Sequence, residues 1–399
     1  MSNRKAAFYI LLTILTLADL SCKKSDSAPG TGTVTFIKEY DMGSYTFNTS
    51  YIEQMPDGGY LILGYNGAGT KSLLLRLSKY GNLDWKREIG DDSFVTEFVH
   101  PLGDGTYIIN DNNHFRVSKI DTFGRVLTYN QFGQTGTDIL NNQPLQNGPG
   151  GTYMISISTG GYAGSSQNTV LHFDHNLNYT GQDDFNDSNY FSGKSITFGA
   201  YQENASGSFN VFGEKLLKQN WNWSDPRKLY FAKVAKGKKT AIAIIDSAEQ
   251  YVDENPYWYI VNPDSSIVVV CQRIDYAINK STPFIVKVDK NLKVDWETNI
   301  EEANKNILTR IVSPLSDGGY LITGSTNNGT NGTLPYELKL DANGNKVWSR
   351  TVAIPGNSTF DLAIPCSDGG VIFVGATTGF GNGKGKQGIF VKTDANGNL

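Results

Sequence analysis

Three residues in the middle of the chain, Trp221, Trp223 and Arg227, have the types and spacing that best suit ligand binding. Two aromatic rings beside the Asn222 amide and a guanidinium could stack on a sugar ring and hydrogen-bond its hydroxyl groups. Alternatively, both tryptophans pack over the core of a neighbouring sheet, because Trp is mostly buried in folded proteins. Both interpretations stay open, and the three residues are the candidate ligand-binding set.

Other residues that could bind a metal ion or a phosphate group are better explained by turns, strand ends and loops. The turns at Asp341 and Asp394 carry several side-chain oxygens, as a calcium loop does, but lack its further ligands and its final Glu. His172 and His175 lie on either side of a predicted strand end, which suits a single metal ion poorly. The Gly-rich stretch 379–388 lacks the Gly-Lys-Ser/Thr ending of a phosphate loop. We predict no catalytic residue, no metal and no cofactor.

The N-terminus has the order of a secretory signal. Arg4 and Lys5 precede an apolar run, 6–18, that is shorter than the roughly 20 residues of a membrane span. Cys22 follows this run, and the arrangement resembles a bacterial lipoprotein signal, which implies that Cys22 carries a lipid. A polar, Gly/Pro/Ser-rich stretch follows, as in a flexible tether. The predicted segments are a signal peptide (1–21), a tether (22–32) and a folded domain (33–399).

Charge and cysteine content narrow the compartment and the partners. The 399-residue chain has a formal net charge of −4, which provides no electrostatic basis for binding nucleic acid. Apart from Cys22, the cysteines are Cys271 and Cys366, and we expect both to be buried free thiols, because unpaired Cys behaves as a small hydrophobe. The lipid would be the membrane contact of an expected monomer in the bacterial cell envelope, at the outer membrane, facing either side.

The elements that must position these residues come from a repeated unit, clearest at 316–350. It consists of an Asp-Gly-Gly turn, an apolar run, a variable loop, a second apolar run, an Asp-x-Asn-Gly turn and a Trp. The residue that starts the second turn recurs every 43 to 61 residues, about 53 on average, as in repeat architectures. The sequence therefore contains seven units. The residues that start their second turns are Ser78, Asp121, Asp174, Ala235, Asp289, Asp341 and Asp394.

The pattern predicts four strands in each unit. In the first unit these strands are residues 50–54, 60–64, 72–77 and 83–89. The second strand is apolar on both faces, as expected between neighbouring sheets. Trp85, Trp296 and Trp348 share one fourth-strand position and would wedge between sheets. The pairs Asn343-Gly344 and Asn396-Gly397 favour a two-residue hairpin turn. The run Tyr257-Trp258-Tyr259, at the start of a first strand, favours packing over ligand contact.

The two chain ends complement each other. The seventh unit stops at Leu399 before its fourth strand, and residues 34–40 have the character of that strand, with Phe36 at the Trp position and Glu39 at the position of Glu88. Pairing them would leave no open sheet edge. The predicted fold is therefore all-β: a seven-bladed β-propeller of four-stranded antiparallel blades, closed by the N-terminal strand completing the last blade.

The motifs SDGGYLITG and ELKLDANGNKVW resemble β-propeller repeats of secreted and lipid-anchored bacterial proteins. Residues 341–348 also resemble the hairpin of quinoprotein-type propellers, which non-enzymatic assembly scaffolds share. The resemblance implies a fold and no particular activity. The adjacent Cys pair of the quinoprotein enzymes is absent from this sequence, which counts against a quinone cofactor.

The favoured hypothesis is a lipid-anchored binding module or scaffold that recognises a protein or glycan partner without catalysis. Its variable loops between second and third strands would carry recognition, as loops on rigid scaffolds commonly do. The alternative is a carbohydrate-active hydrolase or lyase, which requires two carboxylates roughly 5–10 Å apart. A third hypothesis is a purely structural scaffold, which a wide and flat apolar patch would favour.

Overall fold

A computed structural model describes residues 34–40, 47–66, 72–89, 96–102, 104–111, 116–131, 139–142, 146–147, 153–159, 167–186, 195–202, 208–216, 227–235, 238–244, 252–275, 277–303, 305–327, 333–353, 358–377 and 387–399. The chain divides into the units Met1–Thr33 and Val34–Leu399, and every described residue belongs to the second. Cys22, the predicted signal peptide and the tether lie outside these residues. Within the described ranges, no helix has the length and apolar character needed to cross a bilayer.

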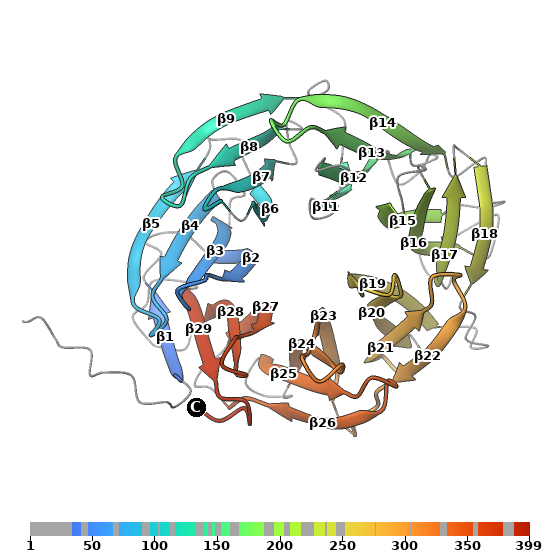
Figure 1. Cartoon of the computed structure of the whole chain (residues 1–399). Helices are drawn as coiled ribbons and strands as arrows, with labels where there is room; N and C mark the ends of the chain where they lie inside the picture. Colours follow the sequence, from blue (N-terminus) through green and yellow to red (C-terminus); the bar gives the residue numbers. More distant parts are fainter. Residues whose placement is uncertain are drawn as a thin grey trace, which may run out of the picture. The chain divides into compact units, whose positions relative to one another are not determined.

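The described part of the chain is all-β, and strands that follow one another in sequence pair in antiparallel sheets (Figure 1). The first two sheets contain β2 (Phe47–Gln54), β3 (Tyr60–Asn66), β4 (Ser72–Leu77) and β5 (Leu83–Ile89), then β6 (Thr96–Pro101), β7 (Tyr107–Asp111), β8 (Arg116–Ile120) and β9 (Val126–Gln131). The next two contain β10 (Ile139–Asn142), β11 (Gln146–Asn147), β12 (Tyr153–Thr159), β13 (Gln167–Phe173) and β14 (Tyr179–Asn186), then β15 (Ser195–Gln202), β16 (Ser208–Leu216), β17 (Arg227–Ala235) and β18 (Lys238–Ile244). A fifth contains β19 (Val252–Val261), β20 (Ile267–Asp275), β21 (Lys280–Val288) and β22 (Val294–Asn299).

The last sheet joins two four-stranded groups. One group contains β23 (Ile307–Pro314), β24 (Tyr320–Asn327), β25 (Thr333–Leu340) and β26 (Lys346–Thr351), and the other contains β27 (Ser358–Pro365), β28 (Val371–Thr377), β29 (Gln387–Thr393) and β1 (Phe36–Tyr40). The pair Thr333–Ser358 connects β25 to β27. The N-terminal strand β1 therefore lies beside the C-terminal strand β29.

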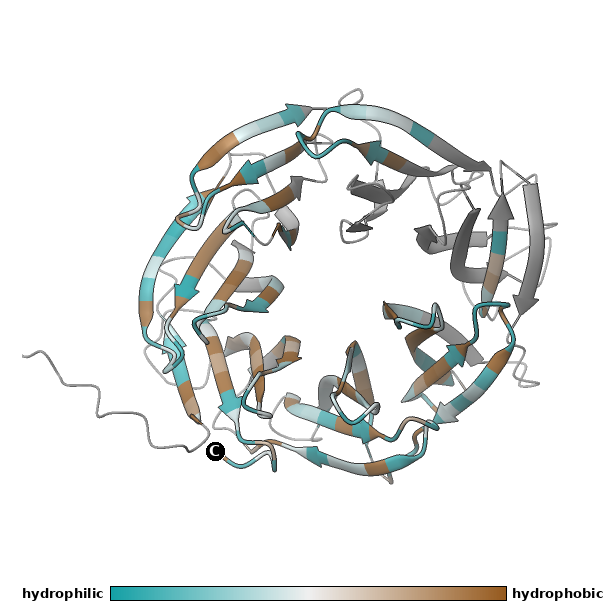
Figure 2. Cartoon of the chain, in the orientation of Figure 1, coloured by the Kyte–Doolittle hydropathy of each residue, from teal (hydrophilic) through white to brown (hydrophobic). Residues whose placement is uncertain are grey.

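Burial decreases from the second strand of a group to its outermost strand. All residues of β28 and the first six residues of β20 are buried, and both strands are nearly continuous apolar runs, as expected for strands covered on both faces. In β5, by contrast, Ile89 is the buried residue and the remaining ones are exposed or half-buried. Figure 2 shows hydrophobic residues gathered on the inner strands and more hydrophilic ones on the outermost strands.

Aromatic residues occupy one register position of the outermost strands. Trp85, Trp296 and Trp348 share this position, as predicted, and Phe36 of β1 has it too. Each lies opposite a basic residue of the third strand, in this order: Arg76, Lys287, Lys339 and Lys392. All four rings are partly buried against a hydrophobic core shared with the neighbouring group.

The Asp-x-Asn-Gly turn differs from its prediction. A two-residue Asn343-Gly344 turn is wrong, because β25 and β26 are joined by the five residues 341–345. The Gly344 N–H donates to the Asp341 carbonyl oxygen over 3.1 Å. Gly344 has a φ of +81°, and a β-carbon there would lie 2.6 Å from the ring of Trp296 in the neighbouring sheet. The close approach of Trp296 therefore requires glycine here, and the positive φ favours it, although Leu177 and Leu292 have φ values of 65° and 64° at the same turn position.

Neighbouring groups share hydrophobic cores, and the first and last groups are neighbours as well. The core between them contains Ile52, Tyr60, Leu75, Ile372 and Phe390. These side chains come from β2, β3 and β4 on one side and from β28 and β29 on the other. Sequence-distant ends of the folded unit thus share a hydrophobic core, as consecutive groups do.

Candidate functional site

Among the predicted ligand-binding residues, Arg227 alone lies in a described element. It begins β17, where its backbone is opposite Leu216 of β16, and nothing is described of its side chain. Trp221 and Trp223 lie outside the described residues. Ligand binding by Trp221, Trp223 and Arg227 therefore stays a prediction.

The carboxylates of the Asp-x-Asn-Gly turns are occupied by their own turns. Asp341 Oδ1 accepts the N–H groups of Asn343 (2.9 Å) and Asn345 (2.8 Å), and Oδ2 accepts the Asn345 side-chain amide over 3.0 Å. Hydrogen bonds from Asn345, then Asn343, lower the pKa of Asp341. The backbone pattern recurs at Asp121, Asp174, Asp289 and Asp394. The prediction that these carboxylates form turns is confirmed.

A second series of carboxylates pairs with basic residues of the third strand. In the Asp-Gly-Gly turn, Asp317 Oδ1 accepts the Gly319 N–H over 3.0 Å, and Oδ2 accepts from Lys339 over 2.6 Å. The hydrogen bond from Lys339 lowers the pKa of Asp317. The ion pair recurs at Asp57–Arg76, Asp104–Lys119 and Asp368–Lys392. These pairs were not predicted, although a basic residue always stands two positions before the start of the second turn.

The first strands carry β-bulges at a repeated position. Each of the first strands β2, β6, β19, β23 and β27 has one extra residue in its pairing with the second strand of its group. The extra residue always lies opposite the peptide bond between the fourth and fifth residues of that second strand. The extra residues are Ser50, Glu97, Tyr257, Arg310 and Asp361. Bulges redirect side chains and occur frequently beside functional sites. These residues therefore share one position on the first strands.

Glycine on the second strand makes room for the bulge. The fifth residue of β3, β24 and β28 is Gly64, Gly324 and Gly375, respectively. A β-carbon at Gly324 would collide with the carbonyl group of Leu308 in β23. The glycine that ends the run Tyr-Leu-Ile-Thr-Gly is thus a sequence signal for the bulge in these three groups, whereas β6 and β19 carry the bulge opposite Asp111 and Cys271.

Two bulge residues of adjacent groups, Tyr257 and Arg310, contact each other at the surface. The Arg310 guanidinium carbon lies 5.3 Å from the centroid of the Tyr257 ring, a cation–π geometry. Tyr257 is 37% exposed and Leu308, also on β23, is 38% exposed. No ion pair of Arg310 occurs among the described residues. Of the three aromatic residues predicted to pack, Trp258 and Tyr259 are partly buried against hydrophobic cores, as predicted, whereas Tyr257, at the bulge, is exposed.

A carboxylate occupies the equivalent bulge position of the next first strand. Asp361 of β27 accepts the Thr49 N–H through Oδ2 over 3.3 Å, and so bridges to β2. The strands β19, β23, β27 and β2 contact one another in this order. We call Tyr257, Leu308, Arg310 and Asp361 the first-strand cluster. It combines an aromatic ring, an apolar side chain, a cation and a hydroxyl acceptor.

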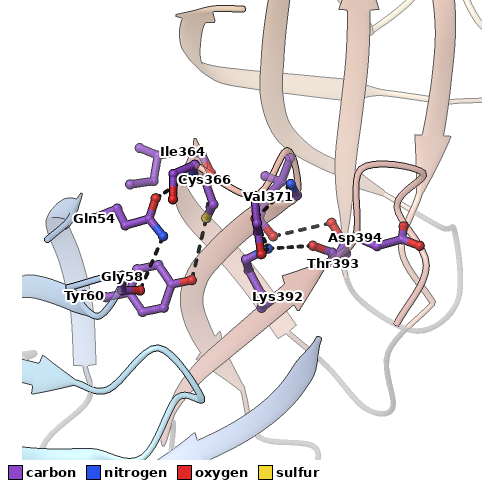
Figure 3. A network of polar contacts seen from close by, with 12 residues as sticks. Gln54, Gly58, Tyr60, Ile364, Cys366, Val371, Lys392, Thr393 and Asp394 are labelled. Carbon is purple, nitrogen blue, oxygen red and sulfur yellow. Dashed lines mark hydrogen bonds and ion pairs between the residues drawn. The ribbon is translucent and has the colours of Figure 1, made fainter. Parts of the chain in front are cut away.

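The contact between the first and last groups contains a second polar network (Figure 3). The Tyr60 hydroxyl lies 3.7 Å from Cys366 Sγ, and the Ser367 N–H donates to Gln54 Oε1 over 2.7 Å. The Lys392 side chain is fully buried beside Asp368, at 2.9 Å. Burial raises the pKa of the Cys366 thiol to about 11, which makes it unreactive. Both described cysteines are free and buried, as predicted.

Glu302, in the connection between β22 and β23, is held by four donors. It accepts from Lys305 (2.8 Å), Lys346 (2.9 Å) and the Tyr336 hydroxyl (2.9 Å), and also from Ser349. Partial burial alone would raise the pKa of this carboxyl, but the hydrogen bonds outweigh it and lower the pKa to about 2. A carboxylate so fully occupied ties the connection to β25 and β26 and has little capacity for a ligand.

No family model and no curated protein matches the sequence. Among solved structures, a Bacteroides caccae protein of unknown function is 13% identical, with 74% of this chain and 94% of that chain covered and a TM-score of 0.46. The extracellular domains of Drosophila Semaphorin 1b are 10% identical (90% and 86% covered, TM-score 0.51). A puromycin-hydrolyzing peptidase from Mycobacterium tuberculosis is 10% identical, with 88% and 51% covered and a TM-score of 0.54. At this identity the similarities show the fold alone: four-stranded antiparallel sheets like those of β-propeller-type proteins.

Proposed function

We propose that this chain is a lipid-anchored β-propeller of the bacterial cell envelope that binds a protein or glycan partner without catalysis. Cys22 would carry the lipid and residues 22–32 would act as the tether. The observation that supports binding most directly is the first-strand cluster, where Tyr257 and Arg310 are exposed beside each other. The recurrent turn carboxylates, in contrast, are already engaged by turns and ion pairs, which leaves them little capacity for acid–base chemistry.

The finer architecture belongs to the same proposal: seven four-stranded blades in a ring, closed where β1 completes the last blade. Support comes from the antiparallel pairing of Phe36 with Lys392 through Tyr40 with Gly388. The core shared by the first and last groups and the Tyr60–Cys366 contact provide further support. In such a ring the first strands line the centre, so the first-strand cluster would lie at the central opening, a common location of propeller sites.

The function is tested by presenting the full-length protein to a glycan array and to a pull-down from envelope extracts. Two variant sets separate the candidate sites: Trp221→Ala with Trp223→Ala for the loop, and Tyr257→Ala for the first-strand cluster. We expect a specific partner whose binding weakens in one set and survives in the other. Turnover of a captured glycan would contradict a non-catalytic role, and the lack of any specific partner would contradict a binding module.

A further inference from the structure

The first-strand cluster has a combination of groups that selects for one chemical class of ligand. Arg310 is exposed, and its guanidinium has no ion pair in the ranges that the structure describes. A guanidinium presents a planar set of donors that matches a carboxylate in two parallel hydrogen bonds. The Arg310 guanidinium already lies over the Tyr257 ring, at 5.3 Å. Less side-chain conformational entropy is therefore lost when a ligand binds. This geometry favours an anionic group with a flat shape.

The side chains around Arg310 indicate which kind of molecule would carry the carboxylate that pairs with it. Tyr257 and Leu308 are 37% and 38% exposed, so they offer an aromatic edge and an apolar surface to a ligand. The C–H face of a sugar ring is suited to such a surface. Asp361 on the next first strand is half-buried and is an acceptor, already holding the Thr49 N–H over 3.3 Å. A carboxylate repels a second anion but accepts hydroxyl groups, which sugars supply.

We propose that the first-strand cluster binds an acidic saccharide, with a uronic acid residue whose carboxylate pairs with Arg310. The ring would lie against Tyr257 and Leu308, and ring hydroxyls would donate to Asp361. This inference rests on the proposed binding function and specifies its ligand class. An acidic peptide supplies the carboxylate without the ring hydroxyls, so it serves as the competing outcome in the test.

The test uses the full-length protein and a hexamer of galacturonic acid, measured by isothermal titration calorimetry. The same hexamer with methyl-esterified carboxyl groups is the neutral probe, and hexaglutamate is the acidic peptide. We expect the acid hexamer to bind at least about tenfold more tightly than either other probe, since hydrogen bonds between charged groups are strong. Equal binding of the ester would refute the carboxylate contact, and equal binding of hexaglutamate would refute the saccharide.

Two variants locate the contact. Arg310→Gln should weaken binding of the acid hexamer by about tenfold or more, whereas Arg87→Gln should leave it unchanged. Arg87 is a matched control, because it is also an exposed arginine but lies on the outermost strand β5. Equal affinities for the two variants would overturn the proposal.

A measurement on the wild type covers the case in which Arg310→Gln fails to fold. Phenylglyoxal labels exposed arginines, and mass spectrometry reports each site separately. We expect the acid hexamer to protect Arg310 and not Arg87, and equal labelling of Arg310 with and without the hexamer would refute the contact. If the hexamer does not bind while the array and pull-down identify another partner, this inference falls and the proposed function stands.

Discussion

The pairing of the two chain ends depends on Phe36, which makes Phe36→Ala a sharp perturbation. Its ring lies 6.5 Å from that of Tyr60 in an edge-on contact. It also covers Gly81, where a β-carbon would lie 2.7 Å from it. An enclosed Phe buries about 150–250 Å², so a half-buried one removes about 100 Å² from water. At about 25 cal/mol per Å², the variant should lower the free energy of unfolding by about 2–3 kcal/mol.

The assay compares Phe36→Ala with Phe123→Ala in urea unfolding followed by Trp fluorescence. Phe123 is 55% exposed, so its loss should change the free energy of unfolding by less than about 0.5 kcal/mol. Hydrogen exchange supplies a local readout, because β1 covers the edge of β29 from Lys392 to Gly388. Amides of β29 should exchange faster in Phe36→Ala alone. Equal destabilisation by both variants, with β29 exchange unaltered, would refute the role assigned to β1.

Three further predictions concern the pH dependence, the bulge and the thiols. The folded pKa of Glu302, about 2, lies below the ordinary 4.5, so its contacts stabilise the fold above pH 4.5 and lose that effect, at most about 3 kcal/mol, as the pH falls from 4.5 to 2. Melting temperatures of Glu302→Gln should vary less over this range, and curves parallel to the wild type would contradict the assignment. Gly324→Ala should destabilise by about 1–3 kcal/mol through its backbone collision; an unchanged thermal melt would mean that glycine is not required opposite this bulge. In a Cys22→Ser background, Cys271 and Cys366 should resist a thiol reagent at pH 8 and react in urea, and rapid labelling of the native protein would show that one of them is accessible.

Much of the strand pattern could be predicted because its determinants are local. Turn residues such as Asp341 and Gly344 specify their own backbone, and apolar runs between turns specify buried strands. The position shared by Trp85, Trp296 and Trp348 could be predicted because it lies at a fixed number of residues after a turn. The same count placed Phe36 in that position, and β1 has the corresponding register in the structure.

The candidate site was less accessible to prediction. The sequence directed attention to Trp221, Trp223 and Arg227, because aromatic and cationic residues cluster there along the chain. The first-strand cluster is dispersed instead, with Tyr257, Arg310 and Asp361 about one repeat apart in sequence. Each of them alone resembles an ordinary strand residue, and they are brought together only by the contacts between successive first strands.

The sequence by itself thus determined the strands, the positions of the turns, the repeat and the matching of the two chain ends, since these follow from side-chain alternation and local backbone preference. Tertiary structure alone decided which residues are redirected by bulges, which carboxylates meet a third-strand cation, and that Tyr257 is exposed. The physical reason is that these features depend on the approach of separate backbones. The contact of Gly324 with β23 illustrates this, because the carbonyl group of Leu308 occupies the space that a β-carbon at Gly324 would need.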